Sequence, residues 1–247
     1  MRSPQQIARS IDHALLHPAL PPNDLESGLA LAREFEVAAV CVKPNDVALA
    51  YKQLEGSHTR VCSVVAFPHG NSCTEIKIAE ALRAVDQGAA EVDYVIDISA
   101  AVAGNFESIQ REMQAMRELE LSRQVTVKVI FENAYLDDTT KTRLCKIAKA
   151  TAISFVKTST GFAAGFDAQH ATGASISDVE LMVRESSPIC QVKASGGIRT
   201  LEKLERFLDA GATRIGTSST REIMTQARRR IEDRSSVAPS EPESQRT

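Results

Sequence analysis

The chain has no tryptophan, and phenylalanine and tyrosine together supply only 4% of its 247 residues. Aromatic faces on which nucleic-acid bases could stack are therefore scarce. Lysine and arginine number 29 against 32 aspartate and glutamate residues, so no basic excess exists to attract a phosphodiester backbone. These two shortages predict that nucleic acid is not a partner.

Paired cysteines and long apolar runs are also missing. The five cysteines are odd in number and widely spaced, without a Cys-x-x-Cys pair, which argues against a disulfide framework and against a zinc site. No apolar run approaches the ~18 residues of a membrane span, and the chain does not start with a charged stretch and a long apolar core. We expect reduced thiols, no membrane partner and a cytoplasmic location.

Short apolar segments alternate with amphipathic segments along most of the chain. Strands are expected at residues 11–16, 37–42, 61–67, 90–96, 125–131, 153–157, 190–194 and 212–216. Alternation of this kind is typical of a parallel α/β sheet, and eight units in about 250 residues favour a closed (β/α)8 TIM barrel over an open sheet. We expect a single barrel domain over 1–233 and a disordered polar tail over 234–247, where Pro and Ser replace apolar residues.

Several helix starts can be predicted from capping residues. Asn23 or Asp24 is expected to cap the helix after the first strand. The Ser-x-x-Glu spacings at Ser72 and Ser177 predict two capping boxes. The apolar stripe over residues 106–116 indicates core packing rather than a cofactor site.

Two of the expected strands carry a lysine that is followed by small residues. Lys157 precedes Thr-Ser-Thr-Gly-Phe, and Lys193, 36 residues later, precedes Ala-Ser-Gly-Gly. A lysine on an apolar strand loses hydration, which lowers its pKa and makes its amine a candidate nucleophile. The alternative is a lysine that reaches solvent or pairs with a carboxylate. Because the gap is one βα unit, we expect the two lysines side by side, where one cation lowers the pKa of the other.

A carboxylate joins this pair, because Asp93 lies among apolar residues of the expected fourth strand. Together Lys157, Lys193 and Asp93 resemble the active-site pattern of the deoxyribose-phosphate aldolases, a class I aldolase family. The resemblance covers about residues 10 to 225. Matching segments occur in the family's order at residues 11–16, 40–42, 67–70, 91–93, 157–162, 193–200 and 216–219.

The resemblance implies reversible cleavage of the phosphosugar 2-deoxy-D-ribose 5-phosphate to acetaldehyde and D-glyceraldehyde 3-phosphate, without a metal or another cofactor. Lys157 would form the Schiff base, Lys193 would keep Lys157 deprotonated, and Asp93 would shuttle protons. Glycines after the last strands would let backbone N–H groups approach the phosphate, although ordinary turns are the alternative. The substrate-binding residues implied are Thr160, Gly161, Gly196, Gly197, Gly216, Ser218 and Ser219.

Departures from the family pattern make the substrate range less well predicted than the reaction type. Phe162 stands where some members place a lysine near the phosphate, and residues 163–170 lengthen the loop after the sixth strand. Two alternatives stay open: another lysine-dependent phosphosugar aldolase of the same barrel fold, or a non-catalytic phosphosugar-binding barrel. Asp12 is either a partner of the lysines or a carboxylate bonded to backbone amides. Assembly into a homo-oligomer is left open.

Overall fold

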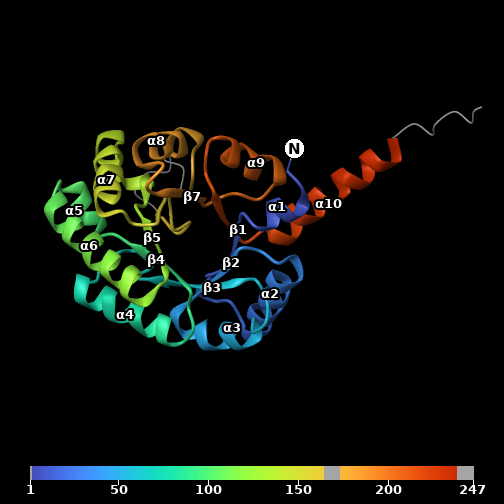
Figure 1. The fold of residues 1–247 in the computed structure, drawn as a ribbon, viewed down its shortest axis with the longest axis horizontal. Coiled ribbons are helices and arrows are strands. Elements are labelled where there is room, and N and C mark those ends of the chain that lie inside the picture. Colours follow the sequence, from blue (N-terminus) through green and yellow to red (C-terminus); the bar gives the residue numbers. More distant parts are fainter. Residues whose placement is uncertain (1, 164–172, 238–247) are drawn as a thin grey trace, which may run out of the picture.

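Eight parallel strands form a closed barrel, and helices surround it (Figure 1). The computed structural model describes residues 2–163 and 173–237. The strands are β1 (Ile11–Leu15), β2 (Ala39–Val42), β3 (Arg60–Val65), β4 (Glu91–Val95), β5 (Thr126–Ile130), β6 (Phe155–Lys157), β7 (Gln191–Ser195) and β8 (Arg214–Thr217). They follow one another around the barrel in chain order. The predicted (β/α)8 barrel is therefore confirmed, and each strand lies within two residues of its predicted ends.

The described helices lie on the outer surface of this barrel (Figure 1). They are α1 (Pro4–Ala8), α2 (Pro22–Phe35), α3 (Val47–Gln53), α4 (Thr74–Asp86), α5 (Ile98–Val102), α6 (Phe106–Arg123), α7 (Asp138–Thr151), α8 (Ile176–Ser186), α9 (Leu201–Asp209) and α10 (Thr220–Val237), with 3-10 turns η1 (Pro44–Asp46) and η2 (Asn133–Tyr135). The apolar stripe of α6 is buried in the core at Ile109, Met113 and Met116, as predicted.

The predicted helix caps were wrong at three starts. α2 begins at Pro22, because proline favours the first helical position, and the preceding residue, Pro21, offers no side-chain cap. α4 begins after Cys73, not Ser72, and has no side-chain cap. At α8 the cap is Ser175, whose hydroxyl accepts a hydrogen bond from the Asp178 backbone N–H. Local spacing identified the helices but not their first residues.

The last helix, α10, runs past the predicted end of the barrel domain. It continues to Val237, four residues beyond the expected boundary at 233, and its C-terminal turns project away from the barrel (Figure 1). This helix has no counterpart among the helices predicted from the sequence. Residues 238–247 of the expected tail lie outside the described residues, so disorder there stays a prediction.

Side chains alternate between two layers along each strand. On β4, Val92 and Tyr94 pack in the apolar core beneath the helices, whereas Glu91 and Asp93 contact Lys128 of β5 inside the barrel. The alternation follows from the two-residue period of a strand. The interior of this barrel therefore contains a charged layer beside a small apolar cluster that includes Cys41 and Cys62, and the main apolar core lies between the sheet and the helices.

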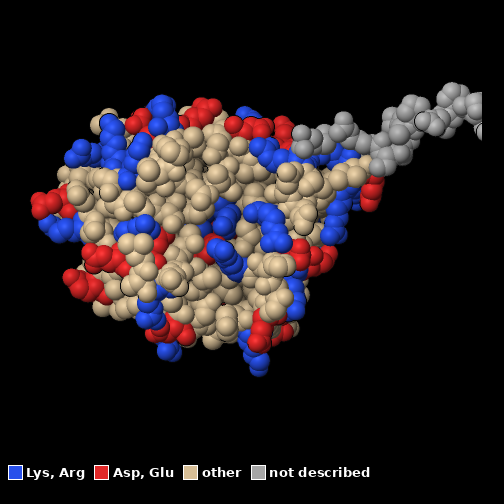
Figure 2. Space-filling view, in the orientation of Figure 1, with Lys and Arg blue, Asp and Glu red and all other residues tan. Residues whose placement is uncertain are grey.

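The thiols are free, as expected, and charges of both signs lie on the surface. On the face drawn in Figure 2, lysine and arginine are interspersed with aspartate and glutamate. All five cysteines are free, and four of them are buried. Within the described ranges, no helix has both the length and the apolarity needed to cross a bilayer.

Candidate active site

The three residues predicted to carry the chemistry lie together inside the barrel. Lys157 of β6 and Lys193 of β7 are register partners on adjacent strands, so the one-unit gap between them does place them side by side. Asp93 lies on β4, which is separated from β6 by β5, and its register partner on β5 is Lys128. All of these side chains are at most 3% exposed.

Asp93 is the carboxylate that these lysines share. Its Oδ2 accepts hydrogen bonds from Lys157 Nζ at 2.7 Å and from Lys193 Nζ at 2.7 Å, and its Oδ1 accepts from Lys128 Nζ at 2.8 Å. Burial alone would raise the pKa of Asp93, but the three ammonium groups outweigh burial and hold its pKa well below the usual range. Asp93 is therefore ionised at neutral pH.

The three lysines differ in how many carboxylates they contact. Lys193 Nζ lies 2.5 Å from Asp12 as well as 2.7 Å from Asp93, and Lys128 Nζ lies 2.5 Å from Glu91 as well as 2.8 Å from Asp93. Burial would lower the pKa of Lys193, yet Asp12 and Asp93 raise it above the usual value. Lys157 has a carboxylate contact only with Asp93 Oδ2 among the described residues, and it shares this oxygen with Lys193.

Asp12 proves to be a partner of the lysines rather than a cap for backbone amides. Its Oδ2 accepts from Lys193, and its Oδ1 accepts from Arg214 at 2.5 Å. Burial would raise the pKa of Asp12, but Lys193, Lys128 and Arg214 hold it well below the usual range. Arg214 also lies 3.2 Å from Glu91 Oε2, so the ionic network extends from β1 through β8 to β4.

Lys128, Glu91 and Arg214 were missed by the sequence-based site prediction. Lys128 occupies an apolar strand, which is the same signal that selected Lys157, and could have been found by applying that rule to every strand. Arg214 and Glu91 carry no comparable signal, because their burial depends on barrel closure. Counting these residues, four basic side chains of the interior contact three carboxylates, and the exposed Arg60 also reaches Glu91 at 3.6 Å.

One group of potential metal ligands occurs in the described part of the chain. The ligand atoms of Cys41, Cys62 and Asp93 lie within 4.8 Å of one another and are buried. However, Lys193 Nζ lies 3.6 Å from Cys41 Sγ and Lys128 Nζ lies 3.4 Å from Cys62 Sγ. A cation bound there would meet two ammonium groups, so electrostatics argues against a metal centre at this position.

The predicted phosphate-binding glycines lie at the ends of neighbouring strands. Gly161 and Gly196 have φ angles of 84° and 95°, which a residue with a side chain rarely adopts. A Cβ added to Gly161 would lie 3.8 Å from Gly196 Cα, so the two turns are in contact. Gly197 accepts a hydrogen bond through its carbonyl oxygen from Lys203 Nζ at 2.8 Å, which puts an ammonium group beside this turn.

Gly216, Ser218 and Ser219 follow a different geometry. Gly216 lies within β8, where an added Cβ would be 2.8 Å from Ser195 Cβ and 3.3 Å from Lys193 Cε. Its lack of a side chain therefore makes room for Lys193. Ser218 is exposed, and the Ser219 backbone N–H donates to Thr217 Oγ1 at 2.9 Å.

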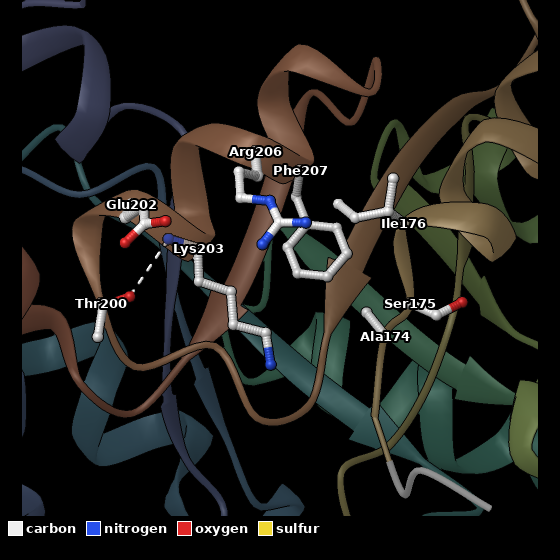
Figure 3. Close-up of a pocket in the computed structure, with 8 residues that line it drawn as sticks. All are labelled: Ala174, Ser175, Ile176, Thr200, Glu202, Lys203, Arg206 and Phe207. Carbon is white, nitrogen blue, oxygen red and sulfur yellow. Dashed lines mark hydrogen bonds between the residues drawn. The ribbon is translucent and has the colours of Figure 1, made fainter.

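A pocket of about 330 Å³ lies beside the Gly197 turn, between the N-terminal ends of α8 and α9 (Figure 3). Its lining residues are Ala174, Ser175, Ile176, Thr200, Glu202, Lys203, Arg206 and Phe207. In Figure 3 the Lys203 side chain extends away from the helix axis, and Thr200, the helix cap, bonds to the Lys203 backbone N–H. None of the predicted site residues lines this pocket; only Lys203 links it to the glycine turn.

Thr160 follows the lysine strand and is held by a residue that the sequence did not indicate. Its hydroxyl donates to Glu132 Oε2, and its Oγ1 accepts from the Phe162 backbone N–H at 3.0 Å. The Thr160 backbone N–H also donates to Glu132 Oε2, at 3.1 Å. The Thr160 hydroxyl proton is therefore already donated to Glu132.

The sequence is similar to that of known aldolases over most of its length. A family profile described as DeoC/LacD family aldolase matches residues 7–226. The chain is 41% identical over 219 residues to the deoxyribose-phosphate aldolase of Streptococcus gordonii, with coverage of 89% of this chain and 96% of the relative. It is 39% identical over 225 residues to the corresponding enzyme of Rhodopirellula baltica, with coverage of 91% and 90%.

Solved structures show the same similarity in three dimensions. A structure described as QR15, an aldolase, superimposes with a TM-score of 0.83 at 33% identity, covering 92% of this chain and 98% of that one. The deoxyribose phosphate aldolase from Aeropyrum pernix, described as having a unique tetrameric structure, gives a TM-score of 0.81 at 30% identity and covers 92% of both chains.

Proposed function

The chain belongs to the DeoC/LacD family of aldolases, and we propose that it reversibly cleaves 2-deoxy-D-ribose 5-phosphate to acetaldehyde and D-glyceraldehyde 3-phosphate. The observation that carries the mechanism is the unequal pairing of the buried lysines. Four basic side chains of the interior share three carboxylates. Lys157 contacts only one carboxylate oxygen, and it shares this oxygen with Lys193. We therefore assign the Lys157 amine as the nucleophile, because it has fewer carboxylate contacts to lose than Lys193 or Lys128.

In the proposed reaction, the Lys157 amine attacks the open-chain aldehyde to give a carbinolamine. Loss of water then gives an iminium ion. The bond between the two-carbon and three-carbon halves breaks as a proton leaves the adjacent hydroxyl, and its electrons enter the iminium to give an enamine. Protonation of the enamine carbon and addition of water release acetaldehyde and restore Lys157. The chemistry uses no metal or other cofactor.

Asp93 and Lys193 have separate roles in this proposal. Asp93 Oδ2 contacts both amines at 2.7 Å, so it can move protons to and from the nitrogen of Lys157 during the carbinolamine steps. Lys193 stays charged because Asp12 and Asp93 raise its pKa. Its charge next to Lys157 favours the neutral form of the Lys157 amine.

We assign the substrate's phosphate to the small residues at the ends of β6, β7 and β8. The contact between the Gly161 and Gly196 turns and the ammonium group of Lys203 beside Gly197 support this assignment. Thr160 lies between these turns and Lys157 in the chain and is assigned to the sugar as a hydrogen-bond acceptor through Oγ1, because its hydroxyl proton is already donated to Glu132. The proposed binding residues are Thr160, Gly161, Gly196, Gly197, Gly216, Ser218 and Ser219.

The tetrameric Aeropyrum relative favours assembly of this chain into a homo-oligomer. Assembly and a cytoplasmic location both stay predictions.

Borohydride trapping tests the proposed function directly. Incubation with acetaldehyde and borohydride should produce a covalent adduct on the peptide that contains Lys157, because an iminium can be reduced whereas a salt-bridged ammonium cannot. Peptide mass mapping identifies the site. An adduct on Lys193 alone, or no adduct, would contradict the assignment, and an absence of adduct would favour a non-catalytic phosphosugar-binding barrel. Turnover of other phosphosugars under the same conditions separates this activity from that of a related aldolase.

Replacement of Lys193 by leucine should shift the pH dependence of cleavage to higher pH. The change removes the positive charge beside the Lys157 amine, so the rate at neutral pH should fall and should recover in part as the pH rises. Lys193→Arg keeps the charge and is the matched control. The measurement is kcat/KM against pH, and a profile that falls in height without moving would make Lys193 a positioning residue instead.

A further inference from the structure

Glu132 has a backbone conformation that residues with side chains seldom adopt. It lies two residues after β5, is 1% exposed, and has a φ angle of 57° in the left-handed region. Such a conformation is unfavourable and persists only where the surroundings enforce it. Here the flanking amides point at the lysine strand: Phe131 N donates to the Lys157 carbonyl at 3.0 Å, and Asn133 N donates to the Thr158 carbonyl at 2.9 Å.

The two oxygens of the Glu132 carboxylate are used unequally. Oε2 accepts hydrogen bonds from both the backbone N–H and the hydroxyl of Thr160. Oε1 is buried and has no hydrogen-bond partner in the described part of the structure. A buried carboxylate oxygen without a partner is costly and rare, so its presence calls for a ligand or a functional reason.

The charge of Lys157 also affects the pKa of Glu132. Burial raises the pKa of Glu132, and the hydrogen bonds from Thr160 together with the Lys157 charge offset that rise only in part. Because the Thr160 hydroxyl already donates to Glu132 and accepts from the Phe162 N–H, it has little capacity left to donate to a sugar. Glu132 Oε1 is therefore a free acceptor next to the lysine strand, and among the described residues Ser159 Oγ and Asn133 Oδ1 are also buried without a partner.

We propose that Glu132 determines specificity for hydroxylated substrates by accepting, through Oε1, a hydrogen bond from a hydroxyl of the three-carbon half of the sugar. Thr160 holds the carboxylate in place for this contact. The inference rests on the proposed aldolase activity and deepens it. Acetaldehyde has no hydroxyl, so the contact exists when the three-carbon half is present and is absent when acetaldehyde alone binds Lys157.

Glu132→Gln tests this inference because the amide keeps the shape of the side chain but removes its charge and turns one acceptor into a donor. We expect kcat/KM for deoxyribose 5-phosphate cleavage to fall about 10- to 100-fold, the range for a lost hydrogen bond to a charged group. Borohydride trapping of acetaldehyde on Lys157 should stay within about threefold of the unsubstituted chain. In the synthetic direction, addition of acetaldehyde to glyceraldehyde 3-phosphate should fall, whereas addition to a second acetaldehyde should not.

Glu120→Gln is the matched control. Glu120 of α6 is 4% exposed and accepts from the Val127 backbone N–H at 2.8 Å and from Arg117 at 2.7 Å, so it contacts the start of β5, whereas Glu132 follows the end of that strand. The Glu120→Gln substitution should leave kcat/KM within about threefold of the value for the unsubstituted chain. If the melting curve shows that Glu132→Gln folds poorly, Glu132→Asp is the second variant. Its shorter side chain keeps the charge but moves the carboxylate away from the substrate, so cleavage should fall while acetaldehyde trapping should not.

The outcomes separate the inference from the function on which it rests. Equal losses in trapping and in cleavage would mean that Glu132 only positions the Lys157 segment, and would overturn the specificity role. Unchanged cleavage would overturn it as well. If the unsubstituted chain itself forms no acetaldehyde adduct, the proposed aldolase function fails first, and the Glu132 inference falls with it.

Discussion

Lys157→Ala should lower the rate of deoxyribose 5-phosphate cleavage by at least about 10⁴-fold, because it removes the nitrogen to which we assign the covalent intermediate. Lys157→Arg should be equally inactive although it keeps a positive charge against Asp93, since a guanidinium does not form an iminium. Both variants should also fail to trap acetaldehyde. The measurement is single-turnover cleavage together with peptide mapping after reduction.

Lys43→Ala is the control for this substitution. Lys43 also follows an apolar strand, but it is partly exposed and pairs with Asp46 at 3.5 Å, as expected for a lysine that ends a strand near solvent. Its replacement should leave activity within about twofold. If Lys157→Ala retained more than about 1% of the rate, a second amine would have to serve as the nucleophile, and Lys193 would be the first candidate.

Asp93→Asn should reduce both stability and activity, because one carboxylate serves three buried amines. Breaking a buried ionic pair by removing one partner costs about 3–5 kcal/mol of unfolding free energy. Lys128 keeps Glu91 and Lys193 keeps Asp12, whereas Lys157 loses its carboxylate contact. Turnover should fall on the order of 10²-fold or more, since the proton-transfer group is lost.

The pH dependence of unfolding gives the Asp93 prediction a second measurement. The pKa of Asp93 is lowered in the folded chain, so its stabilising contribution is present above the ordinary aspartate pKa of about 4 and is lost as pH falls through the lower folded value. Asp93→Asn should therefore flatten the acid side of the stability curve in urea titrations. Asp209→Asn, which affects an exposed pair with Arg2, should change stability by less than about 0.5 kcal/mol. An Asp93→Asn chain as stable as its parent would contradict the shared-carboxylate arrangement.

The barrel and the lysine pair could be predicted because both follow from chain order. Alternating strands and helices fix the strand sequence around the barrel, and this order makes residues 157 and 193 neighbours. Lys128 was equally accessible to this reasoning. The helix starts at Pro22 and after Cys73 were not, because capping depends on a local geometry that spacing alone does not determine.

Glu132 illustrates what the sequence could not provide. Its left-handed backbone and its free oxygen arise from contacts with residues about 28 positions away in the chain, which no local pattern records. Asp12 is similar, since the choice between a lysine partner and a backbone cap depended on barrel closure against β8. Closure brings together residues that are distant in the chain, so their pairing becomes visible only in the folded structure.

The charged layer inside the barrel also limits how this protein could be redesigned. Asp12, Glu91 and Lys128 hold the strands together and hold the reactive amines in place, so a change made there to alter chemistry also alters the interior packing of the barrel. Directed evolution of the aldehyde range should therefore enrich substitutions at the strand-end rim, where Phe162 and Lys203 lie, and avoid the charged layer. Libraries restricted to the rim should yield more folded variants than libraries of equal size that include the layer.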